Sequence, residues 1–161
     1  MKPDEVVVRP MVEKDLARVL EIANGLKEAP HWGIDTYRRA LDPGAAVRRV
    51  ALVAEDPGQR RIVGFVVATV VTPEAELETI AVAADAQGAG VAGPLLGAVG
   101  EELLKHRVAE VHLEVRSSNE RALRLYRRSG FVETGRRAGY YSDPVEDAVL
   151  MSRRLESADG T

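Results

Sequence analysis

A candidate anion-binding loop of mostly small residues runs from Gln87 to Gly93, with the sequence QGAGVAG. It follows an apolar, β-branched run (Leu77–Val82) and precedes an amphipathic run (Pro94–Leu104), which predicts a strand, a glycine-bearing loop and a helix. The first backbone N–H groups of a helix have no partner within it, and the helix dipole favours negative charge there. The small side chains would let a phosphate approach the main chain. A tight turn without a ligand is the alternative interpretation.

The loop departs from two widespread phosphate-binding patterns. Gly88, Gly90 and Gly93 are followed by no acidic residue about 20 positions on at a second strand end, as a dinucleotide fingerprint requires. No Gly-Lys-Ser/Thr follows, which excludes a P-loop. The pattern that does match is Q-x-x-G-x-A, from Gln87 to Ala92, followed by Leu-Leu.

A second block with chemical potential begins at Ser118 and reads SNERALRLYRRSGF. Ser118 or Asn119 can cap a helix. Asn119 and Tyr126 are seven residues apart, so they share one helix face two turns apart. Ala122 lies between them on that face and leaves room for a ligand. A core helix with a buried tyrosine is the alternative.

The segment between the two blocks, EVHLEVR, predicts a strand from Glu110 to Arg116. Its valines and leucine point to one face, while His112 and Glu114 share the other. Both polar residues have a plain interpretation as surface side chains. A proton relay through His112 is the alternative role for that residue.

The apolar patterns elsewhere predict the elements that must position these residues, in the order β-α-α-β-β-β-α-β-α-β-β, a mixed α/β layer. The last two strands should form an antiparallel pair joined by a polar connection. Asp35 should cap the second helix. The other expected strands are Val6–Arg9, Val47–Glu55, Arg61–Val71, Phe131–Thr134 and Ala148–Met151, and the helices are Glu13–Asn24, Asp35–Leu41, Pro94 to about His106, and Asn119–Ser129.

Length and composition narrow the function classes. A chain of 161 residues with 45% hydrophobic and 29% charged residues suggests one globular domain, expected over residues 1–155, with a frayed tail over 156–161. The absence of cysteine excludes disulfides and thiolate chemistry, and His31, His106 and His112 lack metal-ligand spacing, so no metal is expected. A net charge of −3 argues against general nucleic-acid binding. No apolar run reaches membrane-spanning length, so we expect a cytoplasmic protein with no membrane partner.

Together the two blocks resemble the hallmark motifs of the GNAT superfamily, the acyl-CoA-dependent N-acetyltransferases. Q-x-x-G-x-A and S-N-x-x-A-x-x-L-Y-x-x-x-G-F occur in the family's order, separated by a strand ending in E-V-R. The strings LEVRSSNERALRLYRRSGF and GYYSDPVEDAVLMSRRL are most similar to the bacterial ribosomal-protein-alanine N-acetyltransferases, which acetylate the N-terminal amine of a small-subunit ribosomal protein. The resemblance covers Val6 to Leu155. It implies a GNAT-like α/β fold with a mixed, mostly antiparallel six- to seven-stranded sheet and helices on both faces.

The same resemblance implies a role for each site residue, with acetyl-CoA as co-substrate. Main-chain groups on the strand before the loop would pair with the pantetheine arm. The loop would hold the pyrophosphate, Asn119 would bond the cofactor near its β-alanine or thioethanolamine part, Tyr126 would act as general acid beside the sulfur, and Glu114 would act as general base. The implied cofactor-binding residues are Ile80, Ala81, Val82, Gln87, Gly88, Ala89, Gly90, Val91, Ala92, Gly93, Asn119, Ala122 and Tyr126.

The chemistry of N-acetyl transfer suits these residue types. An α-amine has a pKa of about 8, so it must lose a proton before it attacks, and a carboxylate can accept that proton. A phenol with a pKa near 10 can protonate the leaving thiolate. Glu78 is the next candidate for the base. Three functions stay open: acetylation of a protein N-terminal amine, acetylation of a small amine, or silent acyl-CoA binding.

Some features depart from the family pattern or keep two interpretations. Family loops carry one or two basic residues where this chain has Gly88, Ala89 and Gly93, and Ala84 replaces a common proline. Tyr140-Tyr141 could line the acceptor groove or pack under a loop. The arginines of the second block are most simply a solvated helix face, and the chain is expected to be a monomer or a homodimer. Those arginines are Arg121, Arg124, Arg127 and Arg128.

Overall fold

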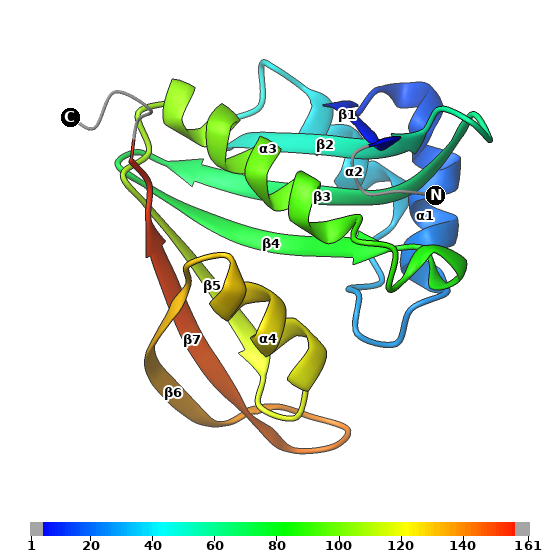
Figure 1. The fold of residues 1–161 in the computed structure, drawn as a ribbon. Helices are drawn as coiled ribbons and strands as arrows, with labels where there is room; N and C mark the ends of the chain where they lie inside the picture. Colours follow the sequence, from blue (N-terminus) through cyan, green and yellow to red (C-terminus); the bar gives the residue numbers. More distant parts are fainter. Residues whose placement is uncertain (1–4, 157–161) are drawn as a thin grey trace.

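Seven strands form one sheet in the computed structural model, which describes residues 5–156 (Figure 1). Their order in the sheet is β1-β2-β3-β4-β5-β7-β6, and every neighbouring pair is antiparallel except β4 and β5. The predicted fold class and order of elements are therefore confirmed. The strands are β1 Val7–Pro10, β2 Arg48–Asp56, β3 Arg61–Val71, β4 Glu74–Val82, β5 Glu110–Arg116, β6 Val132–Tyr141 and β7 Glu146–Arg154.

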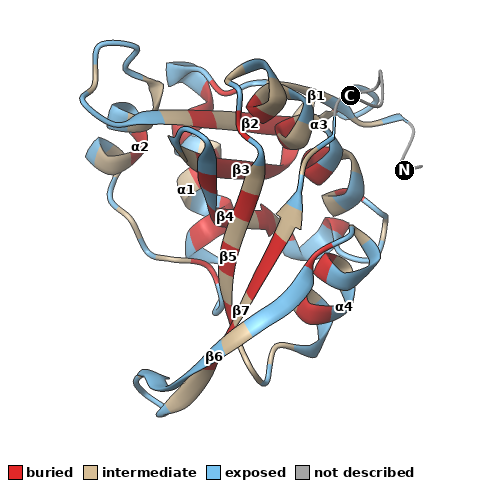
Figure 2. Cartoon of the chain, turned by 90° about the vertical axis from the view of Figure 1, so that its left-hand side faces the viewer, coloured by how far each residue is buried: buried red, intermediate tan, exposed pale blue. Residues whose placement is uncertain are grey.

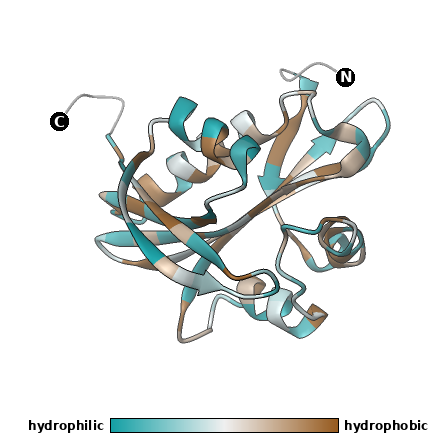
Figure 3. Cartoon of the chain, turned by 90° about the horizontal axis from the view of Figure 1, so that it is seen from below, coloured by the Kyte–Doolittle hydropathy of each residue, from teal (hydrophilic) through white to brown (hydrophobic). Residues whose placement is uncertain are grey.

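Four α-helices cover the two faces of the sheet. Figure 1 shows α3 and α4 on the near face and α1 and α2 behind the sheet, and the view from below separates the same two layers (Figure 3). Strand β3 is buried almost along its whole length because helices lie on both sides of it. The helices are α1 Leu16–Asn24, α2 Ile34–Leu41, α3 Ala92–Lys105 and α4 Glu120–Arg128, with short 3-10 turns at Glu13–Asp15 and Ala84–Ala86.

Several expected boundaries were wrong. Strands β6 and β7 are much longer than predicted and form a hairpin that is paired as far as Tyr141 and Glu146. The sequence hid this extension because β6 is an edge strand exposed along most of its length, which permits polar residues (Figure 2). Of the tail expected over residues 156–161, only Glu156 lies within the described residues.

Two further corrections concern polar residues near helix and strand ends. Asp35 does not cap α2, because Gly33 occupies the capping position and no side chain bonds there; Asp35 instead pairs with Arg38 at 3.5 Å. Strand β4 begins at Glu74, three residues before the expected start at Leu77, so Glu76 also lies within the strand. In contrast, Asn119, one of the two predicted candidates, does cap α4. Its side-chain oxygen accepts a hydrogen bond from the Ala122 N–H at 3.2 Å.

Tyr37→Phe should stabilise the protein by about 1 kcal/mol at neutral pH, because the Tyr37 hydroxyl is buried and no described group bonds to it. Burial raises the pKa of Tyr37 to about 12. The folded state therefore keeps this proton while the unfolded chain loses it above about pH 10, so stability falls as the pH rises from 10 toward 12. Urea unfolding at about pH 8 and 11 measures this effect. Between the two pH values, the free energy of unfolding of the variant should fall by about 1.4 kcal/mol less than that of the wild type. Equal losses in both proteins would contradict this account.

Candidate active site

The sheet splits between β4 and β5. The two strands pair only over three positions, from Glu74 with Glu110 to Glu76 with His112. Beyond Glu76, β4 continues to Val82 without a strand partner on that side, and the ribbons diverge (Figure 1). The register against β3 shifts at this point and leaves Glu78 as one extra residue. Such a bulge bends β4 and increases its twist while the pairing with β3 continues, and it lies where the split from β5 begins.

The open edge of β4 fits a ligand with an amide chain. Ile80, Ala81 and Val82 are held by β3 on one side, in register with Val66, Phe65 and Gly64, and face the split on the other. Unpaired main-chain groups on a strand edge bind a second extended chain readily. The pantetheine arm of coenzyme A has two amides and the right shape for this edge. The observed strand edge therefore fits the cofactor that the sequence implied.

The loop after β4 exposes a set of backbone donors. Gly88 and Gly90 have φ values of +84° and +79°, a conformation that glycine adopts without strain. No described group accepts a hydrogen bond from the backbone N–H of Gly88 or Gly90, or of the three residues that follow Gly90. Pro94, the third residue of α3, has no N–H to leave unpaired. This cluster of free N–H groups at a helix N-terminus is suited to a diphosphate.

A close contact with the sheet holds the loop in place. A Cβ on Gly64 would lie 2.9 Å from the Ala81 carbonyl oxygen and 3.1 Å and 3.2 Å from side-chain carbons of Leu95 and Val91. Only glycine lets the first turn of α3 approach β3 this closely. Val91 and Leu95 are fully buried there. The N-terminus of α3 is thus fixed beside the end of β4.

Glu114 lies in a groove of about 440 Å³ whose charged side chains are three carboxylates and one arginine. The groove is formed at the base of the split, with Glu74 and Glu76 on β4 facing His112 and Glu114 on β5. The burial of β5 alternates as predicted, with its apolar face buried and its polar face open (Figure 2). Sequence reasoning missed Glu74 as a groove residue, although its alternation with Ala75 and Glu76 was a usable signal.

The hairpin of β6 and β7 surrounds the Glu114 carboxylate. Arg137 Nη2 lies 3.7 Å from Glu114 Oε1, and the Arg137 guanidinium stacks on the Tyr140 ring at 5.5 Å. Hydrogen bonding with Glu114 raises the pKa of Tyr140, and burial, followed by the charge of Glu114, raises the pKa of Tyr141. Tyr140 and Tyr141 therefore lie near Glu114, but neither lines the groove, so a role in the acceptor groove stays a prediction.

Tyr126 is buried on α4 and does not line the acidic groove. Its ring packs against Phe131 with centroids 5.6 Å apart. Burial raises the pKa of Tyr126 to about 12, with a smaller contribution from Tyr141. Tyr141 is thus electrostatically coupled to both Glu114 and Tyr126. The capping bond occupies the Asn119 carbonyl oxygen and leaves its amide N–H₂ group available.

Residues 5–156 contain no group of three or more side chains that could hold a metal ion. None of the helices in this range is both long and apolar enough to cross a membrane.

The split sheet with helices on both faces and a donor-rich loop at the N-terminus of α3 defines the GNAT-like fold. The chain belongs to the acetyltransferase (GNAT) family, since the family model matches residues 16–131. In the crystal structure of the ribosomal-protein-S18-alanine N-acetyltransferase from Escherichia coli, 96% of that chain superimposes on 95% of this one, with a TM-score of 0.81 and 31% identity. The predicted family and its enzyme class, the acyltransferases, are thereby confirmed.

Sequence relatives carry the same name. The [ribosomal protein bS18]-alanine N-acetyltransferase of Haemophilus influenzae is 33% identical over 141 residues, 86% of this chain and 91% of that protein. Its Escherichia coli K12 counterpart is 42% identical over 94 residues, 57% of this chain. That alignment spans 64% of the Escherichia coli protein, slightly under two thirds of its length.

Proposed function

We propose that this protein transfers the acetyl group of acetyl-CoA to the N-terminal α-amine of a protein. The observation that carries this proposal is the unpaired edge of β4, from Leu77 to Val82, which leads directly into the free N–H groups of the loop after it. An extended amide chain on the strand edge and a diphosphate at the loop are the two parts of one coenzyme A molecule. The named relatives support an alanine of ribosomal protein bS18 as the acceptor.

The acceptor amine attacks the thioester directly, so the reaction needs no covalent enzyme intermediate. The amine nitrogen forms a bond to the thioester carbonyl carbon, and the carbon–sulfur bond breaks. Glu114 takes the proton that the amine loses, directly or through water, and Tyr126 donates a hydrogen bond to the departing sulfur. The pKa of about 12 keeps the Tyr126 proton in place at neutral pH, as a donor requires. Because a thiol, with a pKa of about 8.5, is a stronger acid than this phenol, the hydrogen bond stabilises the thiolate before any complete proton transfer.

The acidic wall of the groove supports a cationic acceptor. Three carboxylates, those of Glu74, Glu76 and Glu114, face a single described arginine, Arg137. An α-ammonium group followed by basic residues would meet opposite charge along this wall, which favours its encounter and orientation. A small polyamine would meet the same charges, so the acceptor test must include both.

A peptide with N-terminal alanine followed by arginine or lysine should have a KM about fivefold lower than one followed by glutamate, because partly exposed charge pairs contribute about 1 kcal/mol. The difference should shrink at high salt, which screens exposed charges. The rate of thiol release from acetyl-CoA measures the acetylation of each peptide, and spermidine and free amino acids are tested as competing acceptors. Turnover of the small amines alone would contradict acetylation of a protein N-terminus.

A further inference from the structure

The loop assigned to the phosphates has no positive charge of its own. Residues 83–93 contain no lysine, arginine or histidine, and their one charged residue is Asp85. Asp85 is held by Arg61 at 2.6 Å, so that arginine is already engaged. Backbone N–H groups would meet the cofactor's phosphates with partial charges only. A full positive charge at this site would have to come from another element.

Arg121, in the first turn of α4, is a second basic side chain that reaches the loop, and it contacts Gln87. Its guanidinium donates a hydrogen bond to the side-chain oxygen of Gln87, and Gln87 Nε2 donates to the Val82 carbonyl oxygen at 3.2 Å. This chain of bonds joins the end of β4, the loop and α4. No described carboxylate pairs with Arg121, and a guanidinium has five donors, so most of its hydrogen-bonding capacity is free.

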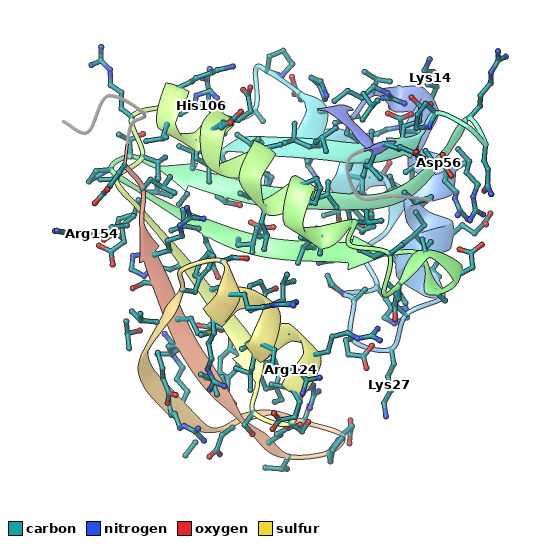
Figure 4. The ribbon with its side chains drawn as sticks, in the orientation of Figure 1. Lys14, Lys27, Asp56, His106, Arg124 and Arg154 are labelled. Atoms are coloured by element: carbon teal, nitrogen blue, oxygen red, sulfur yellow. The ribbon has the colours of Figure 1, made fainter. Side chains whose placement is uncertain are left out.

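Other arginines extend the positive charge along α4. A hollow of about 400 Å³ on this helix is lined by Arg121, Arg124, Arg127 and Arg128 alone. Figure 4 labels Arg124 on α4, remote from the C-terminal end of α3 that His106 marks. At about 100° per residue, Arg124 projects about 60° from Arg121 and Arg127 about 120° from it. Arg128, seven residues after Arg121, projects within about 20° of it, and all four arginines share the one hollow.

We propose that Arg121 binds a phosphate group of coenzyme A and provides, from α4, the charge that the loop lacks. The inference rests on the proposed function, because it assumes that the loop and the β4 edge hold this cofactor. The phosphate is either the pyrophosphate at the loop or the 3′-phosphate of the ribose, and both present oxygens to a guanidinium in the same way. Cofactor fragments distinguish the two, since dephospho-CoA lacks the 3′-phosphate and pantetheine lacks every phosphate.

Arg121→Ala should weaken the binding of coenzyme A about tenfold or more in calorimetry, since a charged hydrogen bond contributes about 1.5–3 kcal/mol. Pantetheine binding should not change. An equal loss for dephospho-CoA places Arg121 on the pyrophosphate, whereas a loss confined to coenzyme A places it on the 3′-phosphate. The matched control is Arg136→Ala, which removes the same charge from β6, outside the arginine-lined hollow, and should bind all three compounds like the wild type. Arg121→Lys should show an intermediate loss, because it keeps the charge without the planar fork.

The salt dependence of binding separates a direct contact from a structural one. Removing a phosphate contact should make coenzyme A binding less sensitive to potassium chloride, because fewer charges are then screened. If Gln87→Ala reproduced the whole loss of Arg121→Ala, and neither variant altered the salt dependence, Arg121 would only position the loop and the inference would be wrong. Unchanged affinity in Arg121→Ala would overturn the inference alone. Failure of the wild type to bind coenzyme A would overturn the proposed function as well.

Discussion

Glu114→Gln should lower kcat/KM about a hundredfold at neutral pH, within the range of about 10²–10⁴ that a general base contributes. The amide keeps the size of the side chain and can still accept a hydrogen bond from Tyr140, but it cannot take up a proton from the amine. An α-amine with a pKa of about 8 is mostly protonated at neutral pH, so the variant depends on the small free fraction. The deficit should therefore narrow as the pH rises above about 8, where solvent deprotonates the amine unaided.

Two variants make this result specific. Glu133→Gln removes a carboxylate from the exposed β6 strand, where Glu133 pairs with Arg136 at 3.0 Å, and it should leave kcat/KM unchanged. Glu78→Gln tests the rival base. Burial raises the pKa of Glu78, but its carboxylate accepts from Thr69, lies 3.8 Å from Arg49 and does not line the groove. Full activity in Glu114→Gln together with a loss of activity in Glu78→Gln would show that Glu78, and not Glu114, is the general base.

Tyr126→Phe should lower kcat by about 10- to 100-fold while KM for acetyl-CoA changes little, because a hydrogen bond to a charged group contributes about 1.5–3 kcal/mol. The effect should appear in kcat because thiolate charge develops only as the carbon–sulfur bond breaks. Phenylalanine preserves the ring that packs against Phe131, so the melting temperature should be nearly unchanged. With its pKa at about 12, Tyr126 should impose no alkaline loss of activity until the pH approaches 12.

Tyr37→Phe is the matched control for this variant. It removes the same hydroxyl from a buried ring that meets Phe65 edge to face, with ring centroids 5.9 Å apart, away from β5 and α4. Its kcat should equal that of the wild type. A wild-type kcat in Tyr126→Phe as well would show that the phenol takes no part in thiolate departure, and the proton would have to come from solvent.

Local patterns were sufficient where an element's own residues determine its structure. The alternation of EVHLEVR predicted both the bounds of β5 and the shared face of His112 and Glu114, because strand side chains alternate whatever the neighbours are. The Asn119 cap and the following helix were equally local. The final hairpin could not be predicted in this way, because β6 is an edge strand and needs no apolar alternation. Its length becomes visible only from its pairing with β7.

The sequence by itself determined the family, the order of elements and which side chains have the chemistry for acetyl transfer, because these follow from residue types and short spacings. Only the tertiary structure decided where β4 and β5 part, since the bulge at Glu78 exists in the register against β3 and not in β4 alone. Long-range packing likewise brought Glu74 and Glu76 to face Glu114, and placed Arg121 beside Gln87, 34 residues away in the chain. Contacts of that kind depend on how distant strands and helices meet, which no local pattern encodes.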